Sequence, residues 1–338
     1  MKVGIPRALL YHYYYPFWKT YFEELKVEIM LSPATNKAIM NHGIRVSVPE
    51  ICVPIKVYLG HVISLADRGA DLIFVPRFVS IQKGQFFCPK FMGLPDMIRH
   101  SLPELESKML SPIFESSTDD LASSVAQYRI IEEKLGISRS ENRQALQKAE
   151  AVWLDFRRWN LKGYDIPEAM ALATGSKKTA TEEPSVVAIE NIPDITLGVL
   201  GYVYNLYDPM ISLDIVQRLR EMGVRVETFE MIEDKVLKEQ LTGMPKTMFW
   251  TFSDKLFAAG YHFYKKPEID GLIHVTAFGC GPDSMLGKLL ELDSGKYNKP
   301  FMTIRIDEHS GENHVQTRIE AYVDMIRRKK MITEQRGA

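Results

Sequence analysis

Short apolar runs recur along the chain and alternate with longer segments whose apolar positions repeat at helical spacing. Short apolar runs bounded by turn residues are typical of strands that are buried on both faces, and the longer pattern predicts helices. The predicted strands cover residues 2–6, 27–31, 71–76, 195–200, 224–229, 271–276 and 301–306. Strands separated by helical segments indicate parallel sheets with helices on both faces.

Two passages share one order of predicted elements, although their residues differ. In the first, the opening strand is followed by an aromatic loop up to Tyr15 and by a helix over 16–25, which Pro16 begins. In the second, the strand at 195–200 is followed by a loop over 205–209 and a helix over 212–222. Each passage ends in another strand and is therefore a βαβ unit. We expect an α/β protein with two Rossmann-like, or flavodoxin-like, parallel-sheet lobes and additional helices.

A composition shift separates the two predicted lobes. Residues 173–184 are small and polar and lack apolar periodicity, which is typical of a linker. Charged helical patterns over 127–135 and 140–159 precede this segment and extend the first lobe. The expected division is an N-terminal lobe over 1–172 with Cys52 and Cys88, a linker over 173–190, a C-terminal lobe over 191–330 with Cys280, and a flexible tail over 331–338.

Composition narrows the class of protein. A length of 338 residues with 46% hydrophobic residues can bury a sizeable core, and a net charge of −1 provides no basic field for a nucleic acid. The first residues lack an apolar signal core, and no apolar stretch reaches the length of a bilayer span, so we expect a cytoplasmic protein away from membranes. Three cysteines argue against a disulfide framework and predict reduced thiols.

Each cysteine stands beside proline or glycine at a predicted turn between a strand and a helix. Pro54 follows Cys52 by two residues, Cys88 directly precedes a proline, and Cys280 lies between two glycines. A helix N-terminus has unpaired N–H groups and positive dipole potential, which stabilise a thiolate there. The placement suggests an iron-sulfur cluster, in which three thiolates would leave one iron of four open.

Spacing alone leaves another interpretation open. The chain has no C-x-x-C pair, and free cysteines are often buried in ordinary cores. Judged by spacing, three unrelated core cysteines are the simpler interpretation. The neighbouring prolines and glycines favour the cluster, because a core cysteine has no need of a turn.

Several polar residues near these turns are further candidates. Lys56, Arg77 and Lys90 lie close to the first two cysteine segments, and Arg7 follows the first strand. These four cations are predicted to offset the charge of a thiolate-ligated cluster or to bind a phosphate-bearing substrate, and solvated surface cations are the alternative.

Two titratable residues follow the last predicted strand. Glu308 and His309 stand where a general acid or base reaches the crevice at a sheet edge. The alternative role for this segment, which includes Asp307, is to cap and stabilise the loop.

Six segments in chain order carry a resemblance to a known family. They are residues 2–11, 52–58, 74–77, 88–96, 278–284 and 306–312. These segments resemble those of the acyl-CoA dehydratase activase-related proteins, a group similar to the iron-sulfur subunits of 2-hydroxyacyl-CoA dehydratases, benzoyl-CoA reductases and double-cubane cluster proteins. The resemblance covers most of both predicted lobes.

The resemblance implies that Cys52, Cys88 and Cys280 are ligands of one [4Fe-4S] cluster held between the lobes. Its fourth iron position would be open to water, hydroxide or a substrate oxygen. In those relatives a separate ATP-hydrolysing activator, itself an iron-sulfur protein, supplies low-potential electrons. This chain has no identifiable Gly-rich phosphate-binding motif, so ATP dependence would come from that partner. A double-cubane cluster needs more thiolates than one copy of the chain has.

The implied function is ATP-driven, low-potential reductive chemistry in anaerobic metabolism, by a lyase or reductase of the 2-hydroxyacyl-CoA dehydratase type. The substrate would be an acyl-CoA or another small molecule, and the protein would form a homo- or heterodimer. Two alternatives stay open. One is a non-catalytic iron-sulfur subunit for electron transfer or accessory binding, and the other is a metal-free bilobed ligand-binding protein.

Overall fold

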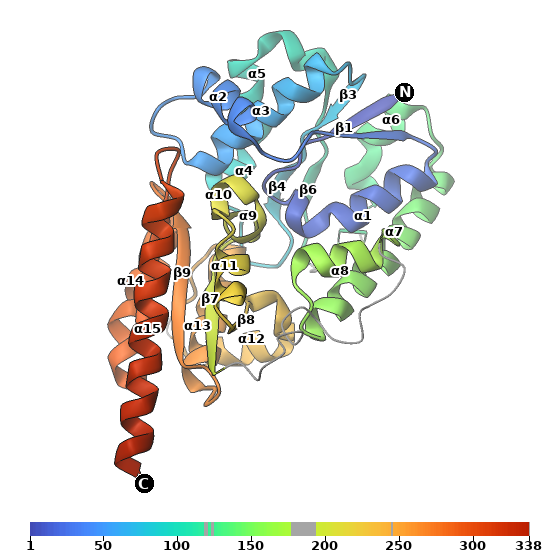
Figure 1. Ribbon diagram of the computed structural model, residues 1–338. Helices are drawn as coiled ribbons and strands as arrows, with labels where there is room; N and C mark the ends of the chain where they lie inside the picture. The colour runs from blue at the N-terminus through green and yellow to red at the C-terminus, as the bar shows by residue number, and fades with distance from the viewer. Residues whose placement is uncertain (118–120, 123–124, 177–193, 245, 338) are drawn as a thin grey trace. The chain divides into compact units, whose positions relative to one another are not determined.

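The computed structural model describes residues 1–117, 121–122, 125–176, 194–244 and 246–337. The chain divides into two compact units (Figure 1). Unit 1 comprises Met1–Arg158, Pro167–Lys178 and Phe249–Phe252, and unit 2 comprises Trp159–Ile166, Thr179–Met248 and Ser253–Ala338. Most of the predicted linker over 173–190 lies outside the described residues, so the predicted domain limits stay predictions.

Unit 1 contains a four-stranded parallel sheet in the order β2-β1-β3-β5. Its strands are β1 (Lys2–Ile5), β2 (Glu28–Leu31), β3 (Leu72–Phe74) and β5 (Met109–Leu110). A two-stranded parallel sheet joins β4 (Arg77–Ser80) to β6 (Ile113–Glu115). The helices up to residue 173 are α1 (Tyr11–Glu24), α2 (Lys37–Val46), α3 (Val53–Asp67), α4 (Pro89–Met92), α5 (Leu94–Ser101), η1 (Pro103–Lys108), η2 (Val125–Tyr128), α6 (Arg129–Leu135), α7 (Arg139–Leu161) and α8 (Ile166–Ala173).

Helices α1 and α3 cover opposite faces of this sheet. A side chain at Gly4 would meet Leu65 of α3, so Gly4 and its register partner Ile73 face α3. The next residue, Phe74, faces the other way, because successive residues of a strand alternate. Its ring centre lies 4.7 Å from that of Trp18 on α1.

The predicted aromatic loop up to Tyr15 is wrong, because α1 begins at Tyr11 and has Pro16 in its interior. An interior proline costs roughly 3 kcal/mol of helix stability. Burial of each aromatic side chain stabilises the fold by roughly 1.5 to 3 kcal/mol, and α1 buries several. The buried aromatic residues of α1 are His12, Tyr13, Tyr14, Phe17, Trp18, Tyr21 and Phe22. Packing therefore outweighs the local preference of proline.

Unit 2 contains a second four-stranded parallel sheet, in the order β10-β9-β7-β8. Its strands are β7 (Ile195–Leu200), β8 (Val224–Glu227), β9 (Gly271–Ala277) and β10 (Phe301–Ile306). The helices after residue 194 are α9 (Val203–Tyr207), α10 (Pro209–Ser212), α11 (Ile215–Glu221), η3 (Phe229–Met231), α12 (Asp234–Leu241), α13 (Thr251–Lys265), α14 (Gly281–Asp293), η4 (Ser294–Tyr297) and α15 (Glu312–Gly337). The prediction of an α/β protein with two parallel sheets is confirmed.

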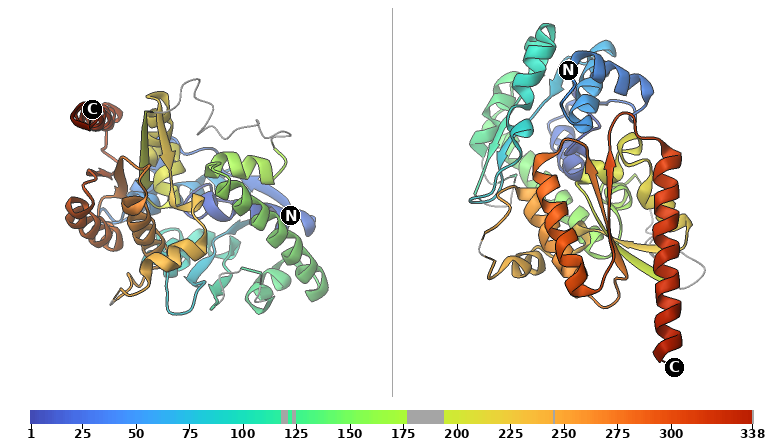
Figure 2. Two further views of the ribbon diagram at one scale, coloured as in Figure 1. Left: turned by 90° about the horizontal axis from the view of Figure 1, so that it is seen from below. Right: turned by 90° about the vertical axis from the view of Figure 1, so that its left-hand side faces the viewer.

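Helices cover both faces of this sheet as well. Leu197 and Val199 of β7 belong to a buried cluster that includes residues of α11 and α15. Gly198, between them, faces Phe263 of α13, and His274 of β9 faces α14. Figure 2 (right) shows the strands between α14 and the long α15. None of the described helices combines the length and apolarity that a membrane crossing requires.

The predicted loop over 205–209 and helix over 212–222 are corrected to three short helices, α9, α10 and α11. Leu213 and Asp214 separate α10 from α11 and have φ angles of 50° and 54°. Two consecutive residues in the left-handed region cannot continue a right-handed helix, so the chain turns there.

Two glycines let α2 and α3 pack backbone against backbone. A Cβ atom at Gly43 would lie 1.7 Å from the carbonyl oxygen of Lys56, and one at Gly60 would lie 1.9 Å from that of Ile39. Real side chains cannot occupy those positions, so the contact of α2 with α3 depends on both glycines. This contact fixes the helix that begins directly after Cys52.

We predict that Gly43→Ala and Gly60→Ala each lower the free energy of unfolding by roughly 1 to 3 kcal/mol or more, because the added methyl group forces the helices apart. The matched control is Gly295→Ala, where a Cβ atom meets nothing within 4 Å, and its effect should stay within roughly 0.5 kcal/mol. Urea unfolding followed by circular dichroism measures all three. Equal stability of the three variants would contradict the packing argument.

Candidate functional site

The strand order of each sheet defines one crevice at its carboxyl edge. In unit 1 the chain passes from β1 to β2 on one side, and β3 then joins β1 on the other side. In unit 2, β8 and β9 flank β7 in the same way. Ligands of open α/β sheets bind at such points, outside the carboxyl ends of the strands where the order reverses.

Each cysteine is the N-cap residue of a helix. Cys52 precedes α3, Cys88 precedes α4, and Cys280 precedes α14. All three have extended backbone, all three are followed by proline at the first or second helical position, and all three are half-buried. One local construction is therefore repeated three times, and it places a thiol beside the unpaired N–H groups of a helix start.

Cys52 and Cys88 lie within electrostatic range of each other in unit 1. Burial raises the pKa of the Cys88 thiol, and the backbone N–H groups of Phe91 and Lys90 lower it. The charge of Cys52 raises this pKa again, and the ammonium of Lys90 lowers it. The net pKa lies above its ordinary value of 9.0, so the metal-free thiol is protonated at neutral pH.

Cys280 lies at the carboxyl edge of the sheet in unit 2. It follows β9, whose last residue, Ala277, is in register with Ile306 at the end of β10. The N–H of Phe278 donates to the carbonyl oxygen of Ile306 at 2.8 Å. The segment that carries Cys280 and the turn with Glu308 thus leave neighbouring strands at one edge.

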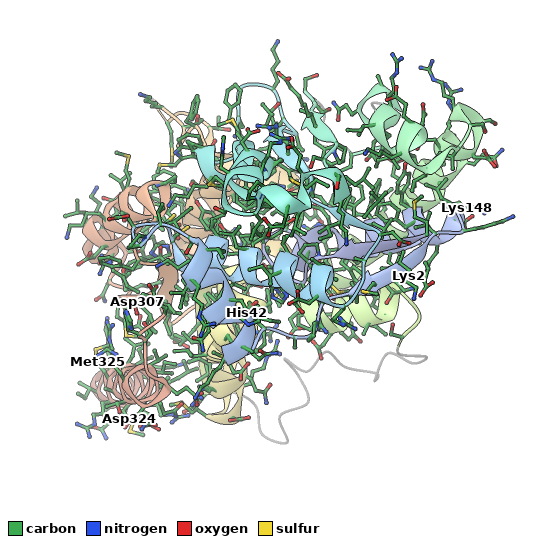
Figure 3. All side chains as sticks on the ribbon, turned by 90° about the horizontal axis from the view of Figure 1, so that it is seen from above. Lys2, His42, Lys148, Asp307, Asp324 and Met325 are labelled. Carbon is green, nitrogen blue, oxygen red and sulfur yellow. The ribbon has the colours of Figure 1, made fainter. Side chains whose placement is uncertain are left out.

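The turn after β10 is stabilised by Asp307. Its Oδ1 accepts hydrogen bonds from the N–H of His309 at 3.0 Å and from the hydroxyl of Ser310 at 2.9 Å. Figure 3, viewed along α15, labels Asp307 in the loop that leads into this helix. Asp307 thus has the loop-stabilising role that was the alternative for this segment. Glu308 is half-buried and His309 is exposed, and their catalytic role stays a prediction.

Two of the predicted substrate-binding cations make contacts within unit 1. The N–H of Arg7 donates to Ser32 Oγ at 2.8 Å, and its guanidinium carbon lies 5.7 Å from the ring centre of Tyr11. Lys56 is only 2% exposed, and its Nζ donates to the carbonyl oxygen of Pro49 at 2.8 Å. The alternative that Lys56 is a solvated surface cation is therefore wrong, since it ties α3 to the loop before Cys52.

Arg77 and Lys90 lie near α4, the helix that Cys88 caps. Arg77 forms an ion pair of 2.7 Å with Asp96, and it also donates to the carbonyl oxygen of Met92. The hydrogen bond from Arg77 is the main reason that the pKa of Asp96 is lowered. Arg77 thereby joins β4 to α4 and α5, whereas Lys90 places its positive charge near Cys88.

An apolar cavity lies in unit 1 beside these helices, and sequence reasoning missed it. Its lining includes Ile5 and Pro6 after β1, Phe74 of β3, Tyr58 of α3 and Phe91 of α4. The volume of about 30 Å³ has room for about two waters but not for an acyl-CoA. No sequence signal reveals it, because the lining residues come from separate segments.

The described residues contain no group of three or more His, Cys, Asp or Glu side chains arranged to hold a metal ion. The donor chemistry nevertheless fits an iron-sulfur cluster, since thiols are its usual ligands and each thiol here begins a helix. Cys52 and Cys88 belong to unit 1 and Cys280 to unit 2, so the predicted ligand set draws on both units.

A comparison with protein families gives one match. The family profile described as CoA enzyme activase uncharacterised domain (DUF2229) matches residues 2–232. A comparison with curated proteins gives no match. The matched range includes Cys52 and Cys88 and ends before Cys280.

We predict that alkylation of Cys88 in the metal-free protein becomes half-maximal above pH 9.0, because burial raises its pKa. Lys90→Ala should move this midpoint higher, since the ammonium lowers the pKa, and Cys52→Ser should move it lower, since the Cys52 charge raises the pKa. Mass spectrometry after timed iodoacetamide treatment measures the midpoint. Shifts in the same direction for both variants would contradict this account.

Proposed function

Because the chain belongs to the CoA enzyme activase uncharacterised domain family, we propose that it is a [4Fe-4S] protein of low-potential reductive chemistry related to the 2-hydroxyacyl-CoA dehydratases. We propose Cys52, Cys88 and Cys280 as the cluster ligands. The observation that carries this proposal is the N-cap cysteine with a following proline, which occurs three times and accounts for every cysteine in the chain.

The surrounding residues support thiolate ligation in unit 1. The N–H groups at the start of α4 and the ammonium of Lys90 both favour the charged form of Cys88. Arg77 joins β4 to α4 through Met92 and to α5 through Asp96, and the glycine contact of α2 holds α3. These contacts orient two thiols before any metal binds, which reduces the ordering that ligation requires.

A bound [4Fe-4S] cluster with three thiolate ligands supplies one-electron transfer and, at its open iron, Lewis acidity. The contribution of this chain is to hold the thiolates and to balance their charge. Electrons would come from a separate ATP-hydrolysing activator, and an acyl-CoA or similar small molecule would be the substrate. Reduced thiols of this kind fit the cytoplasm.

A second candidate is an accessory iron-sulfur subunit that transfers electrons without turning over a substrate. The contacts within unit 1 favour it, because Arg77 and Lys56 already bind Asp96 and Pro49. The apolar cavity is also far below the roughly 300 to 1,000 Å³ of ordinary ligand pockets. A metal-free ligand-binding protein is the third candidate, and it requires no thiol at any helix start.

We predict that anaerobic reconstitution yields a brown protein with about four iron and four sulfide per chain. Replacing any one of Cys52, Cys88 or Cys280 by Ser should remove most of the iron, because each supplies one ligand. Met285→Ser is the matched control, since it exchanges an exposed sulfur side chain on α14 and keeps all three thiols. Iron and sulfide assays measure the outcome, and a colourless wild-type protein would refute the cluster.

The enzyme and the accessory subunit differ in one spectroscopic test. For the enzyme, acyl-CoA added to the reduced protein should change the EPR signal, because a substrate oxygen would bind the open iron. For the accessory subunit, the signal should stay unchanged, and turnover with a supplied activator should be absent. Coenzyme A without an acyl group is the control ligand.

A further inference from the structure

Helix α14 exposes three large apolar side chains on the side that faces away from the core of unit 2. Met285, Leu289 and Leu292 are 64%, 39% and 65% exposed. Their spacing of four and then three residues places them in one row along the helix, which we call the outer stripe. Single exposed apolar residues are ordinary on protein surfaces, whereas a contiguous apolar row marks an interaction surface.

The opposite face of α14 is already occupied within unit 2. Leu286 and Leu290 are fully buried, and a Cβ atom at Gly260 of α13 would lie 2.7 Å from the Cδ atoms of Leu290. A Cβ atom at Gly287 would lie 2.6 Å from the ring of His274 on β9. This face fixes α14 to the sheet and to α13, so the helix cannot turn to bury the outer stripe instead. A helix that is apolar on two sides needs a second surface against its outer side.

Two opposite charges border the outer stripe on one flank. Lys288 and Glu291 stand three residues apart with side chains 62% and 50% exposed, and Lys288 Nζ lies 3.4 Å from Glu291 Oε2. An exposed ion pair of this kind contributes little to stability, so both charges can pair with another molecule at small cost. On the other flank, Asp293 is engaged within unit 2, because it accepts hydrogen bonds from Tyr261 and Lys296 at 2.6 Å each.

The order of the charges on the first flank suits a second copy of the same helix. When two copies pack their outer stripes antiparallel about a two-fold axis, the same flank of each copy meets. Lys288 of one copy then lies opposite Glu291 of the other copy, and symmetry forms the same pair again. Two lysines or two glutamates at these positions would repel their own copy, so this flank is complementary to itself.

We propose that the outer stripe joins two copies of this chain through an antiparallel, two-fold symmetric contact of their α14 helices. This inference goes beyond the proposed function and needs no iron-sulfur cluster. The net charge of −1 leaves little repulsion between copies. One pair of 13-residue helices buries less than the roughly 1,200 Å² of a standard interface, so we expect a reversible dimer with a Kd of roughly 1 to 100 µM.

The contact keeps the crevices of the two copies apart. Cys280 precedes Leu289, near the centre of the outer stripe, by nine residues, which is roughly 14 Å along the helix axis. In an antiparallel pair the two Cys280 turns therefore lie at opposite ends of the contact, roughly 27 Å apart along that axis. The dimer thus leaves both carboxyl-edge crevices of unit 2 outside the contact between the α14 helices.

The test is sedimentation equilibrium of the full chain between roughly 1 and 200 µM, where the wild type should change from monomer to dimer. Leu292→Lys should raise the Kd by about tenfold or more, because it places a charge within the apolar row. The matched control is Ile332→Asp, which changes a 50% exposed apolar side chain on α15 and should keep the Kd within about twofold. Circular dichroism checks that each variant folds.

Charge reversal tests the symmetry of the contact. Lys288→Glu and Glu291→Lys should each raise the Kd by about tenfold, since like charges then face each other. An equimolar mixture of the two variants should recover wild-type dimerisation, because each charge again meets its opposite. No recovery in the mixture would overturn the antiparallel arrangement.

A wild type that stays monomeric up to about 200 µM would overturn the proposal. A dimer that is insensitive to Leu292→Lys and to both charge variants would overturn it too, since the copies would then associate through another surface. If Leu292→Lys fails to fold, the charge variants decide, because both substituted side chains are exposed. Absence of iron after reconstitution would refute the proposed function and leave the dimer untouched.

Discussion

The parallel direction of all strands in both four-stranded sheets is the constraint on which the rest depends. Parallel strands need a crossover between each pair, so every helix that follows a strand begins at the same edge of its sheet. Helix N-termini and their unpaired N–H groups therefore collect at the carboxyl edge. In unit 2 this delivers Cys280 from β9 beside the turn that follows β10. The position of Cys280 thus follows from the strand order of its sheet, whereas Cys52 lies between two helices and Cys88 follows the two-stranded sheet.

Sequence reasoning predicted the buried strands well, because their signal is local. The strands at 195–200 and 301–306 have the predicted limits, since each is a compact apolar run bounded by turn residues. The same reasoning failed where tertiary packing decides. Pro16 is typical of a helix start, yet α1 begins at Tyr11, and Tyr14, which precedes the proline, is buried and stacks on Phe78 of β4. The two-residue strand β5 has too little sequence to give a signal of its own.

In the candidate site, too, local features could be predicted from the sequence and features set by tertiary packing could not. Cysteine followed by proline is a local pattern, so the start of a helix after Cys52, Cys88 and Cys280 could be read from the sequence. The surroundings of a cation cannot be predicted from the residues beside it, because Lys56 is buried with its Nζ on the carbonyl oxygen of Pro49, and Arg77 forms an ion pair with Asp96, nineteen residues later.

The charge of the Cys88 sulfur and the groups that balance it connect the observations made around α4. Burial keeps the Cys88 thiol protonated at neutral pH, and Lys90 with the N–H groups of α4 only partly opposes this. A metal that bound this sulfur would therefore displace a proton, and its binding would become more favourable as pH rises. The protonated, half-buried thiol is a poor nucleophile and resists oxidation. The same burial that hinders ionisation thus protects the thiol, and the charge that ligation in the proposed cluster would create would be met by N–H groups and an ammonium already in place.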